Sequence, residues 1–214
     1  MQHLEEGVDH PTSVEELKDA ISKYQKRVAD VQIAQSQIGI WYKILGTRYL
    51  DTKMYGEAMK CFESALQYYP DNQNLYYYVG ICAGYMSHSA LDFNAEGSSV
   101  KKMNYLKLAE SSYLRAIEIE PRFSSALYAL GILYTFELDE SEKAIPYLEK
   151  LLTIETKHTD AMFVLARCYY STYQFDKAVD LYDKILSITK SAQKKADAET
   201  NKKAALDAAY SYEQ

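Results

Sequence analysis

Residues 42–70 read YKILGTRYLDTKMYGEAMKCFESALQYYP, and the spacing within this stretch decides the fold. Its two halves are Tyr42-x2-Leu45-Gly46-x2-Tyr49 and Ala58-x3-Phe62-x2-Ala65-x4-Pro70. Residues three and four apart lie on one face of an α-helix. The stretch therefore predicts two helices joined by a turn, each with one packing face. Pro70 follows the second helix, because proline cannot continue a helix without losing a hydrogen bond.

The same pattern returns three times. The later first halves are Tyr76-x2-Val79-Gly80-x2-Ala83, Leu127-x2-Leu130-Gly131-x2-Tyr134 and Met162-x2-Leu165-Ala166-x2-Tyr169. The later second halves are Ala109-x3-Tyr113-x2-Ala116-x4-Pro121, Ala144-x3-Leu148-x2-Leu151 and Ala178-x3-Tyr182-x2-Ile185. Small residues at the glycine position allow the paired helices to approach closely, and large residues fill the space around that contact. The pattern divides the chain into four units, 39–72, 73–123, 124–158 and 159–192.

The repeated pattern resembles the tetratricopeptide repeat (TPR), a helix–turn–helix unit of 34 residues. The resemblance covers about residues 39–190 and is strongest in the first two units. It implies an all-α fold, a right-handed α-solenoid of four helix pairs with flanking N- and C-terminal helices. It also implies a protein that holds other proteins rather than one that performs chemistry.

The ends of the chain lie outside the repeats. We expect residues 1–12 to be a flexible N-terminus and residues 13–38 to form a flanking helix, begun by a capping hydroxyl at Ser13. Its apolar residues at helical spacing suggest either a cap on the first repeat or an element that pairs with a copy of itself. Residues 193–214 are alanine- and lysine-rich, and are expected to form a capping helix or part of a fifth repeat.

Two units are longer than the 34-residue pattern. Unit 2 carries an insert of about 17 residues at about 86–103, which we expect to be a loop able to fold over the array, with Met86, Leu91 and Phe93 available for docking. Unit 3 has one additional residue near 138–140, between its helices. Because long loops in compact domains are often functional, the insert is a candidate site.

Composition argues against several classes of function. A net charge of −6 disfavours nucleic acid as a partner, and no apolar run reaches the roughly 20 residues of a membrane span. The N-terminus does not resemble a signal peptide, so we expect a cytoplasmic protein, or a periplasmic or membrane-tethered one if an N-terminal anchor has been removed. Neither the four histidines nor the three cysteines have catalytic or zinc-ligand spacing. We expect no enzyme activity, no metal and no cofactor.

In the TPR family the first helices of the units line a concave groove, and the resemblance places the partner there. The family's clamp for a peptide's terminal carboxylate would fall on Lys43, Thr47, Tyr78, Ser125 and Ala129, of which only Lys43 matches, so that ligand is rejected. The groove positions are instead rich in tyrosine, which accounts for 21 of the 28 aromatic residues. The predicted partner-binding residues are Lys43, Asn74, Tyr77, Tyr78, Tyr85, Tyr128, Phe136, Phe163, Arg167 and Tyr170.

Tyrosine offers a large contact area with a polar tip, which suits recognition of an apolar or amphipathic segment. The predicted function is a non-enzymatic protein–protein interaction scaffold that binds such a segment of another protein or peptide. The alternative is a structural protein that forms a homo-oligomer through the N-terminal helix, with the groove occluded by its own N-terminal helix or by the insert.

Overall fold

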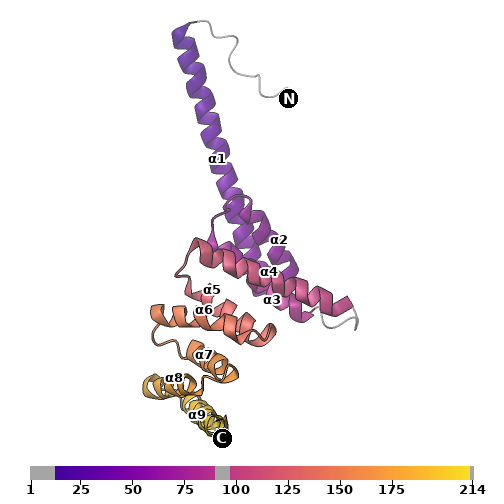
Figure 1. Cartoon of the computed structure of the whole chain (residues 1–214). Coiled ribbons are helices and arrows are strands. Elements are labelled where there is room, and N and C mark those ends of the chain that lie inside the picture. Colours follow the sequence, from indigo (N-terminus) through magenta and orange to yellow (C-terminus); the bar gives the residue numbers. More distant parts are fainter. Residues whose placement is uncertain (1–12, 90–96, 213–214) are drawn as a thin grey trace.

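The computed structural model describes residues 13–89 and 97–212, and in these residues the secondary structure is entirely helical. The helices follow one another as antiparallel pairs stacked into an elongated array, which runs from α1 at one end to α9 at the other (Figure 1). Each helix packs mainly on the helices before and after it in the chain. This arrangement confirms the predicted all-α solenoid.

The first helix, α1, is a single element of 38 residues, Val14–Asp51. It begins with a capping box, in which Ser13 Oγ accepts from the Glu16 N–H at 3.1 Å and Glu16 accepts from the Ser13 N–H at 3.0 Å. Its C-terminal part pairs with α2, Tyr55–Leu66, whereas its N-terminal part projects away from the array (Figure 1). The expectation that this helix occludes the groove is therefore wrong for the projecting residues 14–35.

The second pair consists of α3, Gln73–Ser89, and α4, Gly97–Ile119. Residues 86–89 continue α3 and residues 97–103 open α4, so the predicted insert at 86–103 is not one long loop. Leu91 and Phe93, which were expected to dock, lie outside the described residues. Most of the additional residues of unit 2 therefore form extra helical turns at the end of α3 and the start of α4.

The third unit accommodates its additional residue inside a helix. Helix α5, Ser124–Ile132, runs directly into a π-helical turn, η2, Leu133–Glu137, before α6, Ser141–Ile154. A π-turn holds one more residue than an α-turn, and it projects the following side chains in a shifted direction. The extra residue therefore lies within the first helix, and not in the turn at 138–140 where the sequence placed it.

Close contacts at the repeated glycines hold the pairs together. A Cβ atom on Gly46 would lie 2.7 Å from the Phe62 ring, and one on Gly131 would lie 2.5 Å from the Leu148 side chain. A Cβ atom on Gly80 would likewise overlap the ring of Tyr113. The large residues on these helices form two core clusters, one centred on α2 and α3 and a larger one that continues to α9. The signature residues are therefore packing residues, as predicted, except for Tyr42 and Leu45 of the first unit, which are exposed.

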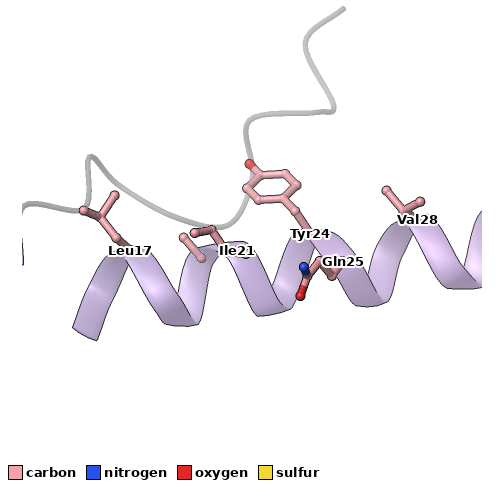
Figure 2. Close-up of a pocket in the computed structure, with 6 residues that line it drawn as sticks. Leu17, Ile21, Tyr24, Gln25 and Val28 are labelled. Atoms are coloured by element: carbon pink, nitrogen blue, oxygen red, sulfur yellow. The ribbon is translucent and has the colours of Figure 1, made fainter. Parts of the chain in front are cut away.

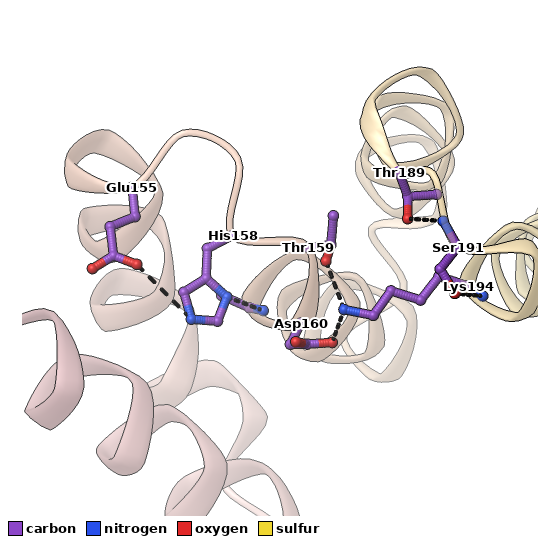
Figure 3. Close-up of polar contacts among 8 residues, drawn as sticks. Glu155, His158, Thr159, Asp160, Thr189, Ser191 and Lys194 are labelled. Atoms are coloured by element: carbon purple, nitrogen blue, oxygen red, sulfur yellow. Dashed lines mark hydrogen bonds and ion pairs between the residues drawn. The ribbon is translucent and has the colours of Figure 1, made fainter.

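The fourth pair, α7 (Thr159–Ser171) and α8 (Phe175–Ile188), is followed by α9, Ala192–Tyr212. Helix α9 packs on α8, where Ala198 and Ala205 are fully buried in the main core cluster. Lys194 reaches from α9 to the start of α7, with its Nζ 2.7 Å from the Asp160 carboxylate and 2.9 Å from the Thr159 hydroxyl (Figure 3). Helix α9 thus occupies the place of the next first helix in the array.

Candidate functional site

Two hollows lie along the face formed by the first helices. We call the first the Tyr85 hollow; it has a volume of about 240 Å³ and is lined by Ile81, Gly84, Tyr85, His88, Tyr113, Ala129, Ile132, Leu133 and Glu137. We call the second the Arg167 hollow; it has a volume of about 410 Å³ and is lined by Phe136, Phe163, Val164, Arg167, Tyr170, Tyr182, Asn201 and Ala204. Five of the ten predicted site residues line one of these two hollows.

The Tyr85 hollow has an apolar floor and a charged rim. Tyr85 is half exposed, and its ring stacks on that of Tyr55 with centroids 4.4 Å apart. At the rim, Glu137 lies 3.4 Å from both His88 Nε2 and Lys102 Nζ. The rim carboxylate therefore already has two basic neighbours, one from the end of α3 and one from the extended start of α4.

The Arg167 hollow combines aromatic walls with a guanidinium group. The Arg167 guanidinium carbon lies 5.2 Å from the centroid of the Phe136 ring, and Phe136 is half exposed. One turn before Arg167 on α7, Phe163 packs against Tyr182 with ring centroids 6.1 Å apart, and α9 contributes Asn201. Across residues 13–89 and 97–212, no carboxylate lies within 4.0 Å of the Arg167 guanidinium. The cation is thus held by an aromatic face and is available to an anionic group.

The π-helical turn shapes both hollows, because adjacent residues of η2 enter different ones. Phe136 lines the Arg167 hollow, whereas Glu137 lines the Tyr85 hollow. The turn is anchored by Thr135, whose Oγ1 donates to the Gly131 carbonyl at 2.7 Å and lies 3.0 Å from Cys168 Sγ. The sequence did not predict that a π-turn directs Phe136 and Glu137 into different hollows, and it did not predict Asn201 and Ala204 as lining residues. The extra residue in unit 3 was the available signal for the π-turn.

The other predicted site residues do not line either hollow. Tyr77 is half-buried among Tyr78, Tyr113 and Phe123, and burial raises its pKa. Tyr78 stacks on Phe62 at 4.9 Å, in the smaller core cluster. These two rings support the walls between helices and leave little of their surface for a partner.

Three more predicted residues lie at other places in the array. Tyr128 packs against His158, with ring centroids 4.8 Å apart, at the junction before α7. The Nδ1 atom of His158 accepts from the Ala161 N–H at 3.1 Å and so caps α7, while Nε2 faces Glu155 (Figure 3). Lys43 lies half-buried on α1, and Asn74 lies in the first turn of α3.

The cysteines have structural surroundings. Cys61, Cys82 and Cys168 are free and buried, and burial raises the pKa of each thiol, to about 12 for Cys82. Such thiols stay protonated and unreactive. Across the part of the chain that the structure describes, no group of three or more His, Cys, Asp or Glu side chains could hold a metal ion. In the same residues, no helix is long and apolar enough to cross a membrane.

Comparison with protein families gives three matches, each described as a tetratricopeptide repeat. They cover residues 40–72, 112–145 and 136–196, which together make up more than half of the chain. The chain is 27% identical over 196 residues to a TPR repeat-containing protein of Borreliella burgdorferi, covering 92% of this chain and 80% of that protein. It is also 27% identical over 143 residues to the mouse DnaJ homolog subfamily C member 7, of which it spans 28%.

Solved structures show the same fold. A TPR protein of Thermus thermophilus superposes with a TM-score of 0.56 at 23% identity, over 77% of this chain and 79% of that one. YrrB, a TPR protein with an unusual peptide-binding site, superposes with a TM-score of 0.62 at 19% identity, over 80% and 76%. MamA gives a TM-score of 0.60 at 20% identity, over 80% and 87%.

Proposed function

Because the chain belongs to the tetratricopeptide repeat family, we propose that it is a non-enzymatic protein-interaction scaffold whose concave groove binds an apolar or amphipathic segment of another protein. The bound segment carries at least one acidic side chain. YrrB, which shares the fold, has a peptide-binding site, and a peptide is the class of ligand that we propose here.

The observation that carries the proposal is the Arg167 hollow. Its aromatic walls offer apolar contact area, and its guanidinium has no carboxylate partner among the described residues. An arginine on an aromatic face is held in place, so less side-chain freedom is lost when it binds a carboxylate. A hydrogen bond to a charged group contributes about 1.5–3 kcal/mol, which corresponds to about 10- to 100-fold in affinity.

The Tyr85 hollow supplies the second contact. Its floor, formed by side chains such as Ile81, Ala129 and Ile132, is apolar, and its rim already contains a carboxylate paired with Lys102. An uncharged apolar side chain of the partner therefore suits this hollow. Both hollows lie on the face formed by the first helices. One bound segment can therefore place an apolar side chain in the Tyr85 hollow and an acidic side chain in the Arg167 hollow.

A peptide-display selection on the full-length chain tests the proposal. We expect enrichment of sequences that combine large apolar residues with Asp or Glu, because these complement the Arg167 hollow. The substitution Arg167→Ala should lower the affinity for an enriched peptide by about 10-fold or more. The matched control is Arg122→Ala, an exposed arginine at the turn between α4 and α5 that lines neither hollow.

Two results would contradict the proposal. One is a selection that enriches no peptide over the background. The other is an enriched peptide that binds Arg167→Ala and Phe163→Ala as tightly as the unsubstituted chain.

The free thiols bear on the compartment. All three cysteines are unpaired, and unpaired thiols are typical of reducing compartments. We propose the cytoplasm as the place where the scaffold works.

A further inference from the structure

Helix α1 carries an apolar stripe that no other described helix covers. Its apolar side chains are between 37% and 67% exposed: Val14, Leu17, Ile21, Tyr24, Val28, Val31, Ile38, Tyr42 and Leu45. Figure 2 shows Leu17, Ile21, Tyr24 and Val28 projecting from the same side of the helix, where they border a shallow hollow of about 440 Å³. The stripe is therefore an exposed, continuous surface.

The spacing of this stripe is that of a coiled coil. From Val14 to Leu45 its members alternate three and four residues apart without a break, with Gln35 as the single polar member. This is a heptad repeat in which Val14, Ile21, Val28, Gln35 and Tyr42 hold the a positions, and Leu17, Tyr24, Val31, Ile38 and Leu45 hold the d positions. More than four heptads of such spacing indicate supercoiling with another helix.

The stripe continues onto the open end of the repeat array. Tyr42 and Leu45 belong to the repeat pattern, where such residues pack on the helix of a preceding unit. Among the described residues no unit precedes α1; the Tyr42 ring stacks on Tyr68 of its own unit with centroids 6.4 Å apart, yet Tyr42 and Leu45 are both more than a third exposed. A partner helix that follows the heptads thus covers the projecting part of α1 and the open edge of the array together.

We propose that the partner is a second copy of this chain, paired with the first through α1 as a parallel, in-register coiled coil. Two-stranded parallel coiled coils combine valine or isoleucine at a with leucine at d. Val14, Ile21 and Val28 meet the first condition and Leu17 the second, while Tyr24, Val31 and Ile38 hold the next three d positions. In register, Gln35 meets the Gln35 of the other copy, and two amides can satisfy each other where a polar group would otherwise face an apolar one.

In the projecting part of α1, up to Gln35, the positions beside the stripe raise no obstacle to pairing two copies, whereas Gly39 at the next e position packs under Tyr69 of its own chain. The only charged residues at the e and g positions between Val14 and Leu45 are Lys18 and Arg27. In parallel register, Lys18 faces Ser13 and Arg27 faces Gln32, so no like charges meet. Without the buried Gly39, the a, d, e and g positions between Val14 and Leu45 supply about 17 residues from each helix, which is of the same order as the 20–30 residues a side of a stable interface.

The length of the projection supports a helical partner. Residues 14–35 project from the array without packing on another described helix (Figure 1), although helices in proteins draw most of their stability from packing of an amphipathic face. Pairing removes the apolar stripe from water, which stabilises both helices.

Sedimentation equilibrium of the full-length chain tests the proposal. We expect a mass of twice 24.5 kDa at tens of micromolar. Substituting Ile21→Glu with Val28→Glu places charges at two a positions and should raise the dimer dissociation constant by at least ~100-fold. The control Ser22→Glu with Ala29→Glu adds the same charge one residue further along, off the stripe, and should leave the dimer intact.

Two further readouts separate loss of pairing from loss of folding. The urea midpoint of the repeat array should be the same in both double variants. Trp41, the single tryptophan, lies at a g position and is 63% exposed, so its emission should shift to longer wavelength when the dimer dissociates. Arg167→Glu should weaken peptide binding and leave the dimer unchanged.

A cysteine cross-link tests the register. Gln35→Cys should form an intermolecular disulfide under mild oxidation, because both thiols then face each other at one a position, whereas Gln37→Cys, on the outer side, should not. A chain that sediments as a 24.5 kDa monomer at about 100 µM, or equal dissociation of both double variants, would overturn the proposal. A dimer cross-linked through Gln37→Cys but not Gln35→Cys would overturn the parallel register.

Discussion

The glycines at the helix crossings show how single residues set the geometry of the array. The alanine methyl at Gly80 would overlap the Tyr113 ring, so we predict that Gly80→Ala lowers the free energy of unfolding by about 1–2 kcal/mol, after the gain in helix propensity is counted. Gly84→Ala, on the same helix, is the control. A Cβ atom there meets nothing within 4 Å, so this substitution should gain up to ~1 kcal/mol. Urea unfolding followed by circular dichroism measures both, and a neutral Gly80→Ala would contradict the close contact between these helices.

The buried tyrosines predict a loss of stability in alkali. Burial raises the pKa of Tyr113 well above its usual value of about 10. The folded chain therefore keeps this proton at a pH where the unfolded chain has lost it. The contribution of the Tyr113 hydroxyl to the free energy of unfolding is fully present below pH 10. As the pH rises further, this contribution falls by up to ~1.4 kcal/mol per pH unit.

Tyr113→Phe keeps the ring against Gly80 and removes the titrating hydroxyl. We predict that it unfolds with nearly the same free energy at pH 7 and loses stability less steeply between pH 10 and 11. Parallel urea titrations at these pH values provide the measurement. Identical slopes for both proteins would show that the Tyr113 hydroxyl does not titrate differently in the folded and unfolded chains.

Residue positions in the repeat predicted the buried packing residues better than they predicted which side chains line the two hollows. Gly46, Ala58 and Tyr113 were assigned to the core and are buried, since their places are fixed by the contact between paired helices. Tyr77 and Tyr78 were assigned to the groove but pack against other rings. A tyrosine side chain is long enough to turn into the space between helices, and the sequence alone does not give its direction.

Among the helices, the order along the chain was predictable but the lengths were not. The flanking helix and the first repeat helix form one continuous helix, α1. In the long second unit, α3 and α4 contain additional helical turns. The π-turn at Leu133–Glu137 has no sequence signature beyond one additional residue, yet it places Phe136 in the Arg167 hollow. Where an extra residue is absorbed depends on the neighbouring helices, and this cannot be read from one segment.

Helix α9 gives a prediction about a whole element. Ala198 is fully buried against α8, so Ala198→Glu should lower the free energy of unfolding by about 2–3 kcal/mol, since an unpaired charge would be buried or the helix would undock. Ala196→Glu, two residues earlier and exposed, should have little effect. Urea unfolding compares them. Equal effects would mean that α9 does not pack on the array as described.

In the molecule as a whole, the two proposed recognition surfaces lie apart from each other. The groove with its two hollows is formed by the first helices of the array, whereas the heptad stripe runs along α1, which projects from one end (Figure 1). Pairing through α1 would therefore leave both grooves free. A dimer of this kind presents two binding grooves, which would increase the apparent affinity for a partner with two copies of the bound segment.

Recognition of an acidic segment by the groove is best measured with a double-mutant cycle between Arg167 and the acidic residue of an enriched peptide. The four affinities come from the unsubstituted chain and Arg167→Ala, each with the acidic peptide and with its amide counterpart. We predict a coupling energy of about 1.5–3 kcal/mol, because the guanidinium and the carboxylate contact each other in the Arg167 hollow. A coupling energy of zero, with the two changes simply additive, would contradict this recognition.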